Sequence, residues 1–93
     1  MRAIRHSTAF RRDYKRAKAG PLGSRLDALL AGVLRALVAG IPLPPEKRDH
    51  RLVGPWSGYR ECHVKPDLLL IYSKPDPTTL ELVRLGSHSE LFE

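Results

Sequence analysis

Apolar side chains recur at helical spacing in one long stretch of the first half of the chain. They lie three or four positions apart and comprise Leu26, Leu29, Leu30, Val33, Leu34, Leu37 and Val38. A helix would gather them on one face, which must then pack against other apolar groups. Ser24 is a favourable cap for the start of this helix, and Gly40 before Ile41-Pro42 ends the pattern. The spacing therefore predicts a core helix between Ser24 and Gly40.

A shorter pattern of the same kind precedes it. Ser7 is a good helix cap and Gly20-Pro21 is a strong stop, and the apolar residues between them recur at helical spacing (Phe10, Tyr14, Ala17). We expect a helix over Thr8–Ala19 that forms a hairpin with the second helix through an apolar seam. Weak alternation in Arg2–His6 indicates a short first strand.

Strand-like runs fill the second half of the chain. They follow a loop over residues 42–55 that is rich in proline and charge, and they are separated by turn signals at Pro66-Asp67 and Pro75-Asp76-Pro77. The predicted strands are Tyr59–Lys65, Leu68–Lys74 and Thr79–Leu85. Their short connections favour an antiparallel meander. The last residues, Ser87–Phe92, suffice for one helical turn with Ser87 as its cap.

Chain length and element order together predict the fold class. A chain of 93 residues supports one modest core, so we expect a single domain over residues 1–93. Its order is β-α-α-β-β-β, an α+β fold in which the helical hairpin packs on an antiparallel sheet and a short helical turn ends the chain. Cys62 has no partner for an internal disulfide, and no apolar leader or membrane-spanning run is evident. We therefore expect a cytoplasmic protein with no membrane attachment.

The composition is strongly basic. Lys and Arg number 16 against 10 Asp and Glu, which gives a net charge of +6 and an isoelectric point near 10. Such a balance favours a polyanionic partner such as RNA. The candidate contacts are Arg11 and Lys15 on the outer flank of the first helix, together with Lys47, Arg48 and Lys65, although most charge runs are only solvated faces.

Candidate proton-transfer groups are crowded into the last 44 residues, namely His50, His63, Asp67 and His88. Imidazole exchanges protons near neutral pH, so imidazoles beside a carboxylate on a cationic surface suggest RNA cleavage. A metal site is not expected, because the three histidines lie 13 and 25 positions apart, without the close pair that begins a zinc ligand set. We expect no cofactor.

Alternation along the strands indicates how these groups could meet. His63 shares a face with Glu61, whereas Cys62 faces the other way and is expected to be a small buried hydrophobe. Alternation does not decide which face Arg84 joins. If Arg84 and His88 flank the end of the last strand, they approach the turn that holds Asp67, and the candidate groups converge there.

The residues of this half resemble a known family, the YafQ branch of the RelE-like toxins. The matching segments are Asp49–Leu52 with Trp56, Arg60–Asp67, Leu70–Tyr72 and Leu82–Phe92. They include the specific runs HVKPD and GSHSELF, and the resemblance covers essentially the whole chain. It departs at Leu85, where close relatives would have threonine, and at Leu68, where an aromatic is common. Both changes bear on substrate fit more than on proton transfer.

This resemblance implies a fold and a function. It implies a RelE-like domain that is a ribosome-dependent mRNA endoribonuclease, the toxin of a bacterial type II toxin–antitoxin pair, inhibited by an antitoxin encoded nearby. The family's active-site pattern falls here on His50, His63, Asp67, Arg84, His88 and Phe92. The antitoxin would be an acidic or amphipathic chain that covers the cationic face.

The candidate residues suit a metal-independent transesterification of RNA. We take His88 as the acid, Asp67 or His63 as the base and Arg84 as the phosphate clamp. His50 would orient the phosphate or act as a second proton-transfer group. Phe92 and Trp56 are possible surfaces for an unstacked base, although Trp56 also fits core packing.

Each role has a structural alternative. His63 can be a cross-strand partner of Glu61 or Asp67, His50 can anchor its loop, and Arg84 can be a solvated strand charge. The turn at Pro66 favours aspartate for its own backbone hydrogen bonds. At the level of function, the rivals are a toxin of the same fold that acts on DNA gyrase, as ParE relatives do, and a basic nucleic-acid-binding module without activity. ParE relatives lack this set of histidines and aspartate.

Overall fold

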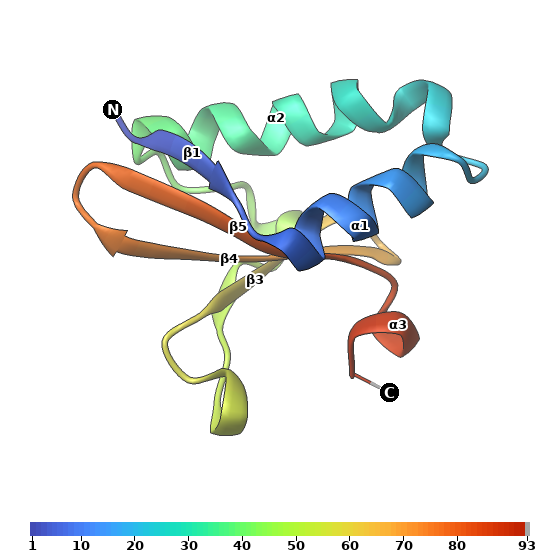
Figure 1. Ribbon diagram of the computed structural model, residues 1–93. Helices are drawn as coiled ribbons and strands as arrows, with labels where there is room; N and C mark the ends of the chain where they lie inside the picture. The colour runs from blue at the N-terminus through green and yellow to red at the C-terminus, as the bar shows by residue number, and fades with distance from the viewer. Residues whose placement is uncertain (93) are drawn as a thin grey trace.

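The chain folds into a five-stranded sheet with two long helices on one of its faces (Figure 1). The computed structural model describes residues 1–92. Its main elements, in chain order, are β1 (Ala3–His6), α1 (Thr8–Lys18), α2 (Leu26–Ala39), β2 (His50–Arg51), β3 (Arg60–Lys65), β4 (Leu68–Asp76), β5 (Thr79–Gly86) and α3 (His88–Phe92). The predicted α+β class and element order are confirmed, with the two-residue β2 as an addition inside the expected loop.

The strand order in the sheet is β1-β5-β4-β3-β2. The meander from β2 to β5 is antiparallel as predicted, but β1 pairs in parallel with β5, from Ala3 opposite Thr79 to His6 opposite Leu82. The expected antiparallel sheet is therefore correct for the meander, whereas β1 adds a parallel strand at one edge. Alternation within so short a strand predicts extended backbone but says nothing about its partner or direction.

Capping determines where the helices begin and end. The Ser7 side chain accepts a hydrogen bond from the Phe10 N–H at 2.9 Å, so α1 begins where the sequence predicts. The prediction that Ser24 caps α2 was wrong. Ser24 lies inside a 3-10 turn, Gly23–Arg25, which leads into the helix without a side-chain cap. Gly40 ends α2 with φ of 74°, a left-handed conformation that glycine adopts without strain.

The main core lies between the helices and the sheet. It joins one face of each helix to one face of the sheet, and its most buried members include Phe10, Leu26, Leu30, Val33, Leu37, Cys62, Val64, Leu70, Tyr72, Leu80, Leu82 and Leu85. We call this face of the sheet the helix face. It carries the apolar seam that the periodicity predicted.

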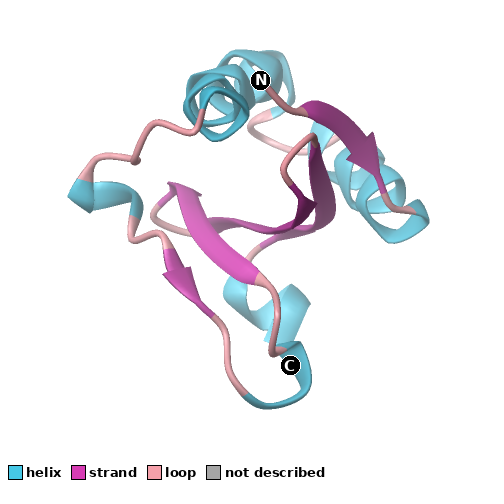
Figure 2. Cartoon of the chain, turned by 90° about the vertical axis from the view of Figure 1, so that its left-hand side faces the viewer, coloured by secondary structure: helices cyan, strands magenta, loops and turns pink. Residues whose placement is uncertain are grey.

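The opposite face of the sheet, here called the open face, carries a smaller cluster. Leu69 and Ile71 of β4 are its buried strand members, and the aromatic residues Trp56, Tyr59 and Phe92 pack against them. Helix α3 and the segment between β2 and β3 lie on this side, opposite α1 and α2 (Figure 1). The N-terminus lies beside the helical layer, and α3, with which the described part of the chain ends, lies on the far side of the sheet (Figure 2). Trp56 thus packs over the sheet, which is the structural role that its sequence also allowed.

A register shift on β5 decides the orientation that alternation left open. Ile71 pairs with Arg84, but the next residue of β4, Tyr72, pairs with Leu82, so Val83 is an extra residue on β5. Such a bulge re-aims the side chains that follow it. Val83 joins the open-face cluster and Leu85 the helix-face core, and Arg84 lies between them at the sheet edge.

Candidate active site

Two of the predicted histidines meet at a buried carboxylate on the open face. Glu61 of β3 is only 5% exposed, and its Oε1 lies 3.5 Å from Nε2 of His50 and 3.9 Å from Nε2 of His63. The pairing of His50 with Glu61 across β2 and β3 brings these side chains together. From the sequence, Glu61 was considered only as a possible cross-strand partner of His63. Its burial between two imidazoles makes it a candidate site residue.

The outer nitrogens of the same histidines are held by backbone carbonyls. Nδ1 of His50 lies 2.7 Å from the Arg48 carbonyl oxygen, and Nδ1 of His63 lies 3.3 Å from that of Pro66. A protonated Nδ1 would donate to each carbonyl and leave Nε2 of each ring facing Glu61. These contacts orient both rings toward the carboxylate, so the anchoring role foreseen for His50 and its candidate role in the site coexist.

Asp49 fixes the short strand that carries His50. Its Oδ1 accepts hydrogen bonds from Nε of Arg60 at 3.1 Å and from the Tyr72 hydroxyl at 2.5 Å. Burial and the contact with Asp49 raise the pKa of Tyr72 above its usual range, so the phenol stays a proton donor. A polar anchor inside the sheet therefore holds the edge strand in place.

The turn after β3, which follows His63, contacts the last helix through the side chain of Asp67. Oδ1 of Asp67, an exposed side chain, lies 3.5 Å from the backbone N–H of His88. The ring of His88 lies 5.2 Å from that of Phe92, centroid to centroid, and Phe92 in turn contacts the edge of Trp56 at 6.2 Å. His63, Asp67 and His88 thus occupy neighbouring segments, with an aromatic group alongside.

Arg84 does not join the histidines through its charged end. Its guanidinium is turned toward α1, where Nε and Nη2 lie 2.6 and 3.2 Å from the two carboxylate oxygens of Asp13. Asp13 is 2% exposed, and it also accepts the Leu85 backbone N–H at 3.0 Å. Burial raises the pKa of Asp13, but the hydrogen bonds from Arg84 and Leu85 outweigh that effect and hold the pKa below its ordinary value. The predicted convergence is therefore partial.

The predicted RNA-contacting cations fall into two groups. Lys47 and Lys65 line a hollow of about 300 Å³ together with His63, and Nζ of Lys47 donates to the Val64 carbonyl at 3.1 Å. Arg48 is exposed beside His50, with a left-handed backbone at φ of 50°. Lys47 and Lys65 thus lie beside His63, and Arg48 lies two positions before His50 in the chain.

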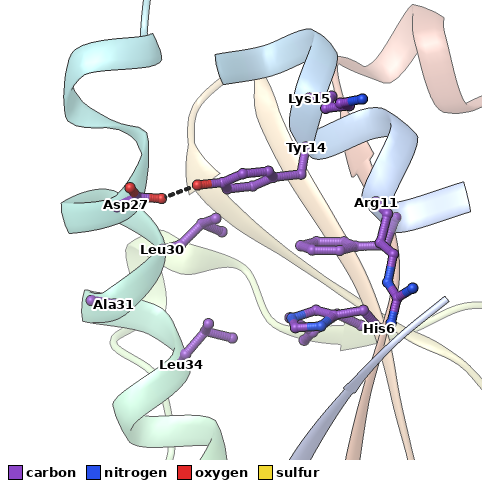
Figure 3. Close-up of a pocket in the computed structure, with 10 residues that line it drawn as sticks. His6, Arg11, Tyr14, Lys15, Asp27, Leu30, Ala31 and Leu34 are labelled. Atoms are coloured by element: carbon purple, nitrogen blue, oxygen red, sulfur yellow. Dashed lines mark hydrogen bonds between the residues drawn. The ribbon is translucent and has the colours of Figure 1, made fainter. Parts of the chain in front are cut away.

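Arg11 and Lys15 lie elsewhere, on the rim of a groove between α1 and α2 (Figure 3). The groove encloses about 680 Å³, and its walls are mostly apolar, with Phe10, Leu30 and Leu34 among them. The Tyr14 hydroxyl donates to Asp27 across the gap between the helices. These two cations are therefore separate from the candidate active site.

The described residues offer limited scope for thiol or metal chemistry. Cys62 is fully buried, and burial raises the pKa of its thiol to about 12, so it stays protonated as the small hydrophobe that the sequence predicted. Within residues 1–92, no three histidine, cysteine or acidic side chains are grouped closely enough to hold a metal ion. Over the same residues, no helix is long and apolar enough to cross a bilayer.

Comparison with known proteins identifies the family. Residues 2–93 match the family described as the bacterial toxin of type II toxin–antitoxin systems, YafQ. The chain belongs to the YafQ toxin family. The resemblance of the HVKPD and GSHSELF runs to this family is thereby confirmed.

Individual YafQ relatives agree with this assignment. A Haemophilus influenzae protein that carries the YafQ name is 42% identical over 60 residues, which cover 61% of this chain and 59% of the relative. The mRNA interferase toxin YafQ of Escherichia coli K12 is 48% identical over 52 residues, which cover 56% of this chain and 55% of the relative. These matches span between half and two thirds of the relatives' length.

Solved YafQ-like structures match over the whole length. A copper-bound mutant toxin from Helicobacter pylori has a TM-score of 0.85 at 38% identity, covering 99% of this chain and 100% of the other. The E. coli YafQ chain in its complex with DinJ has a TM-score of 0.80 at 32% identity, and the match covers both chains completely. The RelE-like fold expected from the sequence is confirmed.

Three acidic residues around the candidate site were not predicted from the sequence. Glu61 faces His50 and His63, and Asp13 binds Arg84. Asp49 instead pairs with Arg60, next to the strand that carries His50. Alternation gave a signal for Glu61, since it shares the His63 face. Asp13 lies 71 positions from Arg84 on a helix flank otherwise crowded with cations, and only the fold brings the two together.

Proposed function

We propose that this protein is the toxin of a bacterial type II toxin–antitoxin pair and that it cleaves mRNA on the ribosome. The observation that carries this proposal is the grouping of His50 and His63 around Glu61. Nearby in the chain is the turn in which the Asp67 side chain accepts a hydrogen bond from the His88 backbone N–H. Membership of the YafQ family supports it, as does the mRNA interferase name of the E. coli relative. RNA cleavage needs proton-transfer groups near a phosphate, and this surface offers several.

The proposed reaction is an internal transesterification. A base takes the proton of the RNA 2′-OH, and the freed oxygen attacks the adjacent phosphorus. The bond from phosphorus to the 5′ oxygen breaks, and an acid gives that oxygen a proton. The products are a 2′,3′-cyclic phosphate and a free 5′-OH, with no metal and no water consumed.

The geometry supports distinct roles for the residues. His88 is exposed at the start of α3 and takes the role of the acid. His63, at the end of β3, or Asp67, in the turn that follows β3, takes the role of the base. His50, which Glu61 faces, orients the phosphate or acts as a second proton-transfer group. Arg84 acts as the phosphate clamp with those N–H groups that Asp13 leaves free.

RNA contacts follow from the surroundings of these groups. Phe92 and Trp56 form an aromatic pair on the open face, which suits stacking of an unpaired base. Lys47, Arg48 and Lys65 supply positive charge for the flanking phosphates. We assign Arg11 and Lys15 to contacts with ribosomal RNA away from the cleavage point. An exposed site with few groups gains from a ribosome that holds the message in line, which places the action in the cytoplasm.

The proposed antitoxin would cover the cationic helical surface. The groove between α1 and α2 has apolar walls and a rim that includes Arg11 and Lys15 (Figure 3). That chemistry suits an amphipathic segment with acidic side chains along its edges. The E. coli homologue was crystallised as a DinJ–YafQ complex, which supports a protein partner of this kind.

Primer extension on mRNA in translating ribosomes tests the proposed function. The arms are the wild-type protein, His88→Ala and wild-type protein on free mRNA without ribosomes. We expect discrete breaks that need ribosomes and that fall by about 10²- to 10⁴-fold in His88→Ala, which removes the acid. Adding the antitoxin encoded beside the gene should abolish the breaks.

His6→Ala is the matched control for cleavage, because His6 is an exposed histidine of β1 that lines the groove between α1 and α2 and not the candidate active site. It should leave the breaks unchanged. Message that stays intact with the wild-type protein would rule out the nuclease and leave DNA gyrase inhibition or simple nucleic-acid binding as the function. Breaks that persist undiminished in His88→Ala would remove His88 from the chemistry.

A further inference from the structure

Polar side chains from the N-terminal part of the chain make hydrogen bonds to the backbone at the exposed end of β5. β1 leaves the sheet after His6, so the last residues of β5 have no strand partner on that side. Two side chains take its place. The Ser7 hydroxyl donates to the Val83 carbonyl at 2.7 Å, and Asp13 of α1 accepts the Leu85 N–H at 3.0 Å. The backbone around Arg84 is therefore fixed on both sides of the bulge.

Asp13 also holds the Arg84 side chain in one orientation. It binds Nε and Nη2 together, which is a two-point contact along one side of the planar guanidinium. A guanidinium has five N–H donors, so three remain, two on Nη1 and one on Nη2. One of these on each Nη forms the end of the fork, an edge that can bind a phosphate through two parallel hydrogen bonds. The grip of Asp13 thus leaves the phosphate-binding edge of Arg84 open.

A second ion pair extends this support to α3. Nη2 of Arg16 contacts Asp13 at 3.1 Å, and its Nε contacts Glu90 at 3.3 Å. Glu90 accepts the Ser87 N–H at 2.8 Å while its own N–H donates to the Ser87 hydroxyl, a reciprocal capping arrangement directly before His88. One face of α1 therefore contacts both segments that carry Arg84 and His88.

The charges of this network cancel. Arg84 and Arg16 face Asp13 and Glu90, so the group of four is formally neutral. Arg84 therefore acts on a phosphate through directed N–H donors rather than through an excess of positive charge. Removing Asp13 would raise the local charge and, by charge alone, tighten RNA binding.

We propose that Asp13 is a positioning residue of the active site, which aims the guanidinium of Arg84 at the scissile phosphate and fixes the strand beneath it. This inference rests on the proposed ribonuclease function, in which Arg84 contacts the phosphate. It assigns a role in cleavage to a helix residue that contacts no RNA. It also makes α1 a structural support of the site.

Two measurements on Asp13→Asn test the proposal. The first is the rate of cleavage on ribosomes, resolved into kcat and KM, with Asp76→Asn as control. Asp76 lies in the distant β4–β5 turn, and its replacement changes the net charge equally. We expect kcat to fall roughly 10- to 100-fold in Asp13→Asn, with KM unchanged or lower, because a misaimed donor costs rate rather than binding. Asp76→Asn should match the wild type.

The second measurement is the NMR signal of the Arg84 Nε–H, which needs no activity. It should exchange slowly in the wild type and rapidly in Asp13→Asn. Unchanged exchange would overturn the positioning role, as would a kcat equal to that of Asp76→Asn. Wild-type protein that cleaves nothing would reject the proposed function, while the NMR result would still decide whether Asp13 holds Arg84.

Arg84→Lys provides a second variant should Asp13→Asn fold poorly. Lysine keeps the charge and can still reach Asp13, but it lacks the planar fork. The proposal expects a loss of kcat comparable to that of Asp13→Asn in a folded protein. Full activity of Arg84→Lys would overturn it, because a single charge would then suffice.

Discussion

The two faces of the sheet bury their residues for different reasons. On the helix face, residues such as Leu70 and Leu80 are completely buried against α1 and α2, and most of their surroundings are apolar. On the open face, Leu69 and Ile71 are just as buried, yet the carboxylate of Glu61 lies beside them with only 5% of its surface exposed. The helix face mainly removes apolar surface from water, whereas the open face also places a buried carboxylate beside two imidazoles.

This difference teaches where function can be found in a small fold. Burying an ionised carboxylate costs free energy unless cations or donors compensate it, and the imidazoles of His50 and His63 are the groups that face Glu61 here. Electrostatic contacts are stronger in such surroundings than in water. The buried charge beside the histidines therefore supports the proposal that this region acts on RNA.

The largest effect is expected from a pair of neighbouring substitutions on β4. Leu70→Ala and Ile71→Ala each remove a fully buried side chain, from the helix face and the open face respectively. Each should lower the free energy of unfolding by about 2–5 kcal/mol, measured by urea denaturation. Cleavage per folded molecule should survive in Leu70→Ala. It should drop in Ile71→Ala, because Ile71 lies in register between Glu61 and Arg84.

The activity of these two variants is compared at a low temperature where both are fully folded, as checked by circular dichroism. Equal residual cleavage in the two proteins would contradict a division of labour between the faces. A loss confined to Leu70→Ala would reverse it.

Sequence patterns predicted more of the structure on the helix face than on the open face. The spacing of Leu26, Leu30, Val33 and Leu37 predicted both a helix and its buried side, because apolar periodicity follows directly from helix geometry. Strand alternation likewise predicted the buried Cys62. With the turn signals, it gave the strands of the meander to within two residues at every boundary. Local pattern suffices where burial depends only on hydrophobicity.

The candidate site could be predicted only in part. His50, His63, Asp67 and His88 stood out because histidine is rare and titrates near neutral pH, and the family resemblance supported them. The orientation of Arg84 could not be predicted, since it depends on a bulge at Val83 and on a helix residue far away in the chain. Long-range charge pairs leave no periodic signal. For this reason Asp13 and Asp49 were missed.

An intermediate effect on the free energy of unfolding is expected for Asp13→Asn, and this effect should depend on pH. Because its pKa in the folded protein lies below the ordinary value of 3.8, ionised Asp13 stabilises the fold above that value, and this contribution is lost as pH falls through the lower folded pKa. Asp13→Asn should therefore be less stable than the wild type by roughly 1–3 kcal/mol at neutral pH. The gap should close below about pH 4.

Urea denaturation of both proteins between pH 7 and pH 2 measures this gap. Asp76→Asn is again a suitable comparator, because the pKa of Asp76 is also lowered, chiefly by the Thr78 N–H, but the residue is exposed. Its gap should have the same sign and be smaller. A stability difference for Asp13→Asn that stays constant down to pH 2 would show that packing, not ionisation, accounts for the role of this residue.

The smallest effect on stability, with a clear effect on function, is expected for Glu61→Gln. Glutamine keeps the size of the side chain but removes the charge that faces Nε2 of His50 and His63. The free energy of unfolding should change by less than about 1 kcal/mol, because the lost attraction is offset by a lower cost of burial. Cleavage should fall roughly 10- to 100-fold, since both imidazoles lose the group that holds them toward one point.

Glu81→Gln is the matched control for this substitution. Glu81 is a half-buried carboxylate on β5, paired with Ser73 of β4 at 3.5 Å and distant from the histidines. It should leave both stability and cleavage near wild-type values. If Glu61→Gln instead destabilised the protein by several kcal/mol while cleavage per folded molecule persisted, Glu61 would be a structural member of the open face. The buried charge would then have to be explained by folding rather than by RNA cleavage.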